Sequence, residues 1–98
     1  MDISFDPTKN ARNIDVHGVS LERVSEFQWE TAFNVEDQRR DYGEQRFQAF
    51  GLIGSRVHVL IHTPREGRVH AISLRKANKR EVRRFEHETQ GKKSAFRS

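Results

Sequence analysis

The sequence contains no cysteine, only two prolines and no long apolar run. Without cysteine the chain can form neither disulfides nor a thiolate metal site, and small domains that rely on such links are usually extracellular. No stretch approaches the ~18 apolar residues that cross a bilayer, and the start MDISFDPTKN lacks the basic and apolar segments of a signal peptide. We therefore expect a soluble, cytoplasmic protein that does not bind membranes.

Hydrophobic residues are scarce, at 34% of 98 residues, whereas charged residues make up 33%. A chain of this length forms one domain with a modest core. That core is expected to cover one face of a few elements, which argues against a deep, enclosed substrate pocket. A functional site is therefore expected on the surface.

Positive charge is concentrated in one half of the chain. Residues 1–45 hold five Lys/Arg against ten Asp/Glu, while residues 46–98 hold thirteen against four. Arginine outnumbers lysine in the basic half, and its planar guanidinium matches the oxygens of a phosphate. The charge indicates a phosphate-bearing partner, but a solvated helix face with a basic tail would show the same pattern.

The N-terminal third predicts two helices. Asp6 followed by Pro7 is typical of a helix start, and Gly18 is suited to a left-handed C-cap, so the first helix should cover 7–17. Ser20 is a second N-cap, and the helix that it begins should end near residue 28.

Alternating apolar residues predict strands in the middle of the chain. We expect strands at 3–5, 31–36, 45–53, 56–63 and 68–75. The polar run EDQRRDYGE is expected to be a loop, and the short links GS and PREG should join antiparallel hairpins. Within 56–63, one face should be core and the other mixed.

Asn78 and Glu81 form a capping-box pattern that begins a last helix, which should end before Gly91. The single domain is therefore assigned to residues 1–90, and residues 91–98 are predicted to be a flexible basic tail.

Three linked segments resemble one known family. FDPTKNARNIDVHGVS, YGEQRFQAFG and HAISLRKANKRE, in this order and spacing, are similar to the BrnT family of bacterial toxins over roughly residues 3–88. The resemblance implies an α+β fold of the RelE type, with an antiparallel sheet of four to five strands, two N-terminal helices and one C-terminal helix. The sequence departs from the family pattern at Val16, Leu74 and Phe85, where Lys, Ala and Tyr are usual.

The resemblance also implies a function. Members are expected to be ribonucleases that inhibit translation and are neutralised by a DNA-binding antitoxin, BrnA, in a hetero-oligomer, expected to be a heterotetramer. DNA would be contacted only through the antitoxin. No metal or other cofactor is expected.

Metal-free RNA cleavage needs a base, a cation to stabilise charge at phosphorus, and an acid for the leaving oxygen. Arg46 and Arg75 are the candidate phosphate clamp, because guanidinium groups bind phosphate through two bonds. The alternative is a salt bridge inside the domain, with Glu44 or Glu81.

Two further residues are catalytic candidates. His17 lies in the matched His-Gly motif and could exchange protons, or it could simply favour the helix C-terminus. Glu44 could be the base, although orienting Arg46 is the more natural role. His58 and His62 have no third ligand at a defined spacing, so zinc is not expected and surface positions are the commoner outcome.

The helix start carries a predicted RNA-binding rim around Arg75. Its members share positive charge at the junction of the last strand and the last helix: Lys76, Lys79, Arg80 and Arg83. Phosphate contacts of this kind do not depend on base sequence. A solvated helix face is the alternative for these residues, and a basic RNA- or protein-binding module without catalysis is the alternative for the whole chain.

Overall fold

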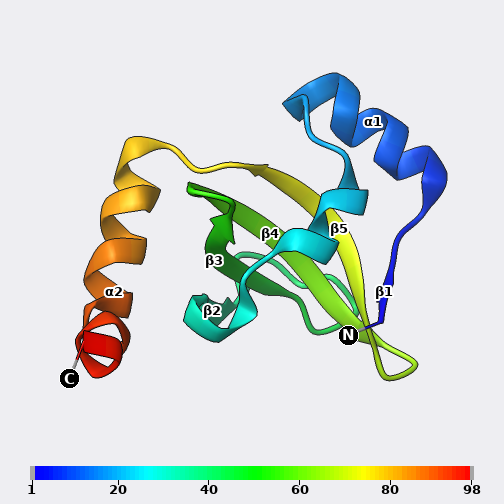
Figure 1. The fold of residues 1–98 in the computed structure, drawn as a ribbon. Helices are drawn as coiled ribbons and strands as arrows, with labels where there is room; N and C mark the ends of the chain where they lie inside the picture. Colours follow the sequence, from blue (N-terminus) through cyan, green and yellow to red (C-terminus); the bar gives the residue numbers. More distant parts are fainter. Residues whose placement is uncertain (1, 98) are drawn as a thin grey trace.

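The computed structural model describes the backbone of residues 2–97 and the side chains of residues 2–89. Figure 1 shows a sheet with helices on both sides. The elements, in chain order, are β1 (Ile3–Ser4), α1 (Pro7–His17), the 3-10 helices η1 (Leu21–Glu26) and η2 (Trp29–Thr31), β2 (Phe33–Glu36), β3 (Phe47–Ile53), β4 (Arg56–Arg65), β5 (Arg68–Lys76) and α2 (Lys79–Arg97). No helix in the described part of the chain has the length and apolar character needed to span a membrane.

The sheet has five strands in the order β1-β5-β4-β3-β2. Strands β2 to β5 form consecutive antiparallel pairs, as predicted from the short links. Strand β1 pairs with β5 in parallel, so the prediction of an antiparallel sheet is wrong at this edge. Strand β1 has only two residues, so its sequence pattern cannot show whether it runs parallel or antiparallel to its neighbour. Its direction is decided by its pairing with β5, which is distant in the sequence.

The first helix agrees with its prediction because its caps are strong. The Asp6 carboxylate accepts a hydrogen bond from the amide of Thr8 at 2.8 Å, and Gly18 closes the helix with φ +71°. The second helix differs, since η1 is a 3-10 helix that ends at Glu26. Its buried residues Leu21 and Val24 are three apart, which matches the three residues per turn of a 3-10 helix.

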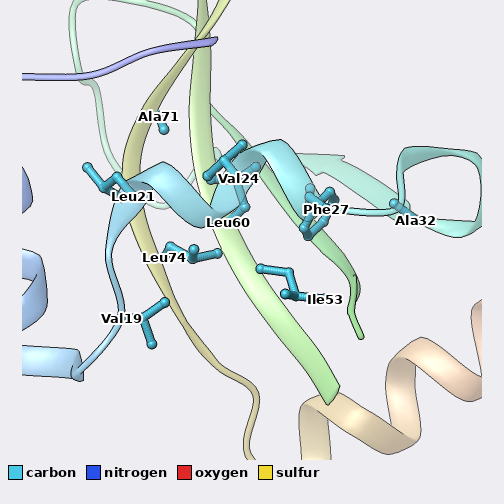
Figure 2. Close-up of a cluster of buried hydrophobic side chains, with 10 residues drawn as sticks. Val19, Leu21, Val24, Phe27, Ala32, Ile53, Leu60, Ala71 and Leu74 are labelled. Carbon is cyan, nitrogen blue, oxygen red and sulfur yellow. The ribbon is translucent and has the colours of Figure 1, made fainter. Parts of the chain in front are cut away.

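One face of the sheet packs against η1. Figure 2 shows Leu21, Val24 and Phe27 lying over Leu60 and Leu74 of the central strands. The ring of Phe27 also explains a strand glycine, because a Cβ at Gly51 would lie 2.5 Å from it. Leu60 lies on the side of 56–63 that the alternation predicts to be mixed, together with His58 and His62, so the sequence did not indicate this core.

The opposite face holds a second core under α2. Phe85 and Ala77 are buried there with Phe50, Val57 and Val59. The prediction of a single core face is therefore wrong. Both residue sets of the alternating strands are apolar enough to be buried once a helix covers each side.

Helix α2 begins with the predicted capping box. The Glu81 amide donates to the Asn78 side chain at 2.9 Å, and the Asn78 amide donates to the Glu81 carboxylate at 3.0 Å. The helix continues to Arg97, past the end predicted before Gly91. One glycine costs a helix only about 1 kcal/mol, so it does not by itself end one. The flexible basic tail predicted for 91–98 stays a prediction, because the side chains of these residues lie outside the described part of the chain.

Asn13 joins α1 to the edge of the sheet. Its side-chain amide donates to the carbonyls of Val19 and Leu74, both at 2.8 Å, and its oxygen accepts from the Leu74 amide at 3.2 Å. The residue is buried. It satisfies backbone groups of β5 beyond the point where β1 pairs with that strand.

Replacing Asn13 with Ala should therefore lower the free energy of unfolding by about 2 to 4 kcal/mol, because buried backbone groups lose their partner. Urea unfolding measures this. Asp15→Ala, at an exposed position of the same helix, is the control and should change stability by less than about 0.5 kcal/mol. Equal effects of the two variants would contradict the role of Asn13.

His58 and His62 are buried, at 2% and 8% exposure, and not on the surface as expected. His58 donates from Nδ1 to the carbonyl of Arg56 at 2.9 Å, so the hydrogen of the neutral ring is on Nδ1. His62 packs between Phe47 and Trp29. Burial lowers the pKa of both rings, so both favour the neutral form.

These histidines predict a loss of stability in mild acid. Because the folded pKa lies below the unfolded value of about 6.5, the unfolded chain takes up protons first. Stability should be fully present above about pH 7 and decrease as the pH falls toward about 5. Urea midpoints at both pH values measure this; His62→Phe should weaken the dependence, whereas the exposed control His87→Gln should not.

Candidate active-site groove

A surface groove of about 380 Å³ lies between α1, β5 and the segment before β3. It brings together Arg46 and His17, which sequence reasoning proposed as catalytic from separate motifs. Its lining residues are Lys9, Arg12, Asn13, Val16, His17, Arg46 and Ile72. The groove is therefore predominantly positive and open to solvent.

Helix α1 presents one face to this groove. Lys9, Asn13 and His17 are spaced i, i+4 and i+8, which places them in one row along a helix. Sequence reasoning assigned no role to Lys9 or Arg12. Lys9 lies eight residues before His17, and Arg12 lies three residues after Lys9, so helical spacing is the signal that could have found them.

Arg46 is held on two sides. Its Nε and Nη2 lie 3.4 and 3.5 Å from Oε2 of Glu44, which are long distances for an ion pair. Its guanidinium carbon lies 4.2 Å from the centre of the Tyr42 ring. The guanidinium thus stacks on an aromatic face, and its side chain retains about a quarter of its exposure.

Glu44 is shared between two arginines, because Arg65 also donates to it, at 3.2 Å. The hydrogen bond from Arg65 and the weaker one from Arg46 hold the pKa of the Glu44 carboxyl below its usual range. An ionised carboxylate with a lowered pKa is a weak proton acceptor. The geometry accordingly favours orientation of Arg46 over a role as general base.

Arg75 makes the salt bridge that the sequence left as an alternative. Its Nη1 and Nη2 donate to the two carboxylate oxygens of Glu81 at 2.7 and 2.8 Å, and this bidentate pair raises the Arg75 pKa. Glu81 is also the capping residue of α2. Arg75 therefore braces the start of this helix, and it is not among the residues that line the groove.

The predicted RNA-binding rim does not gather around Arg75. Lys79 and Arg83 line another cleft, beside Arg56. Each is two residues from Glu81, about 200° around the helix, and so projects away from the Arg75 pair. Lys76 follows Arg75 in β5 and lies on the opposite face of the strand. Arg80 is exposed at the first turn of α2.

The three departures from the family pattern have different consequences. Leu74 and Phe85 are buried core residues, so these apolar replacements affect packing and not the groove. Val16 is 64% exposed and lines the groove. Where the resemblance led us to expect lysine, the groove is thus lined by an apolar side chain.

Metal-ligating side chains are not clustered in the described residues, where no three of His, Asp and Glu come together. The groove offers guanidinium, ammonium and imidazole groups. This donor set suits anions such as phosphate.

The five-stranded sheet, the helices that pack on it and the cationic groove define a small α+β protein whose exposed site has donor groups suited to a phosphate. The chain belongs to the BrnT family, because the family model described as the ribonuclease toxin BrnT of a type II toxin-antitoxin system matches residues 5–81. None of the curated proteins compared with the chain matches it significantly. The family assignment makes this chain a toxin of the ribonuclease type, with an antitoxin as partner.

Proposed function

We propose that the chain cleaves RNA in the groove beside α1, without a metal ion, and that Arg46 binds the scissile phosphate. The observation that supports this best is that Arg46 and His17 line the same open groove, together with Lys9 and Arg12. Basic side chains from α1 and from the segment before β3 thus line one site of the size of a phosphate and its neighbouring groups.

In this mechanism the 2′ hydroxyl of RNA loses its proton and attacks the adjacent phosphorus. The bond from phosphorus to the 5′ oxygen of the next nucleotide breaks, and that oxygen takes up a proton, which leaves a 2′,3′-cyclic phosphate and a 5′ hydroxyl. Arg46 stabilises the negative charge that develops on the phosphate oxygens, and Glu44 orients it. His17 is the candidate for proton transfer, since the two ring nitrogens of an imidazole can accept and donate a proton. Lys9 and Arg12 hold the flanking phosphates.

Arg75 and the rim residues are proposed to contribute to RNA binding outside the groove. Arg75 reaches a phosphate only by sharing or leaving its pair with Glu81, so its first role is to hold α2. The rim residues bind RNA phosphates outside the groove: Lys76, Lys79, Arg80 and Arg83. The ion pair between Arg75 and Glu81 favours the alternative function, a basic binding module without catalysis. One of the two arginines predicted to clamp the phosphate is already bound to a carboxylate.

Changing Arg46 to Ala should abolish RNA cleavage and growth inhibition while the fold persists, because the charge at phosphorus loses its partner; a loss of about 100-fold or more in kcat is expected. Cleavage of naked RNA by the purified chain and growth on induced expression measure this. Arg65→Ala, which also removes a partner of Glu44 but lies outside the groove, is the control and should remain active. Full toxicity of Arg46→Ala would contradict the proposed role of Arg46 and favour the basic binding module without catalysis.

Cleavage should continue in excess chelator, since the proposed chemistry relies on protein side chains alone. The assay compares the purified chain with and without EDTA, and then with added zinc or magnesium. Loss of activity that either metal restores would overturn the metal-independent mechanism.

A BrnA-like antitoxin is the proposed partner in the cytoplasm, in a hetero-oligomer whose DNA contacts come from the antitoxin. The positive groove is complementary to an acidic segment of such a partner. Occupation of the groove by carboxylates would exclude RNA and so neutralise the toxin.

A further inference from the structure

The loop between β2 and β3, residues 37–46, is closed at its neck. The Asp37 amide donates to the carbonyl of Arg46 at 2.7 Å, so the first and last residues are joined. The hydroxyl of Thr63 in β4 donates to the carbonyl of Gln45 at 2.6 Å. Inside the loop, Gly43 has φ +72° and its amide donates to the Asp41 carboxylate. This polar segment is therefore anchored to the sheet at the point where Arg46 leaves it.

The Asp37 carboxylate is the centre of this loop, with a side chain that is 1% exposed. It accepts from Nε and Nη2 of Arg39, both at 2.8 Å, and from the Tyr42 hydroxyl at 3.1 Å. The hydrogen bonds from Arg39 are the main cause that lowers the pKa of Asp37 to about 2, with a smaller one from Tyr42. The carboxylate is thus ionised and bonded at neutral pH.

Tyr42 connects this carboxylate to the groove. Its hydroxyl is bound by Asp37 at one end of the side chain, and its ring carries the Arg46 guanidinium at 4.2 Å. A guanidinium over an aromatic ring is attracted by the ring quadrupole. The ring therefore restrains the position of the Arg46 guanidinium, in addition to the long 3.4 Å contact with Glu44.

We propose that Asp37 and Tyr42 are positioning residues for Arg46: the buried carboxylate fixes the tyrosine, and the tyrosine ring orients the guanidinium toward the groove. This rests on the proposed function, in which Arg46 binds the scissile phosphate. Neither residue touches the substrate in this arrangement. Their contribution is to spare Arg46 the loss of rotational freedom when phosphate binds.

Replacing Tyr42 with Leu removes the ring and should lower kcat for RNA cleavage about tenfold with little change in KM, as expected from the loss of one cation–π contact. Tyr42→Phe keeps the ring and loses the hydroxyl, so its loss should be smaller. Asp37→Asn keeps the shape of the side chain and should resemble Tyr42→Phe. Steady-state cleavage gives kcat and KM, single-turnover cleavage with enzyme in excess gives the rate constant of the cleavage step, and urea unfolding checks that each variant folds.

A double-mutant cycle with Arg46→Gln separates positioning from a general structural effect. If Tyr42 acts through Arg46, Tyr42→Leu should cause no further loss in the Arg46→Gln background. Wild-type kcat in Tyr42→Leu, or losses that multiply in the double variant, would overturn the positioning role while leaving the function of Arg46 intact. Normal cleavage by Arg46→Gln alone would instead refute both proposals. Should Asp37→Asn fail to fold, the two Tyr42 variants still decide.

Discussion

The buried amide of Asn13 is the contact on which the functional surface depends. It pairs with the backbone of β5 at Leu74, beyond the residues of β5 that β1 pairs with, and it thereby fixes α1 along this side of the sheet. The groove exists because α1 is held there, with Lys9 and His17 directed to the same side as Asn13. The same row of α1 thus holds Asn13, which fixes the helix on the sheet, and Lys9 and His17, which line the groove.

Carboxylates determine what each arginine near the site can do. Arg75 donates two short hydrogen bonds to Glu81, which also caps α2, so the charge of Arg75 stabilises the fold. Arg46 has only long contacts with Glu44 and a stacked contact with Tyr42. A guanidinium that is oriented but weakly paired is the better phosphate ligand, because less must be broken when the anion binds.

Much of the fold could be predicted from local signals. The caps at Asp6, Gly18 and Asn78 define helix ends because they satisfy backbone groups within a few residues of the chain. The parallel direction of β1 and the core under η1 could not be predicted, since both depend on partners distant in sequence. His62 was misplaced for the same reason, because the rings of Trp29 and Phe47 that pack against it come from other elements.

The sequence by itself determined the family, the capped helices, the consecutive hairpins and the excess of arginine, because motifs, caps and alternation are properties of neighbouring residues. Only the tertiary structure decided which charges meet. In the folded chain, His17 and Arg46 line one groove, and Arg75 forms an ion pair with Glu81. The polar segment 37–46 is a loop that is anchored around the buried carboxylate of Asp37. The physical reason is that ion pairs and stacking act over a few ångströms in space, whatever the separation along the chain.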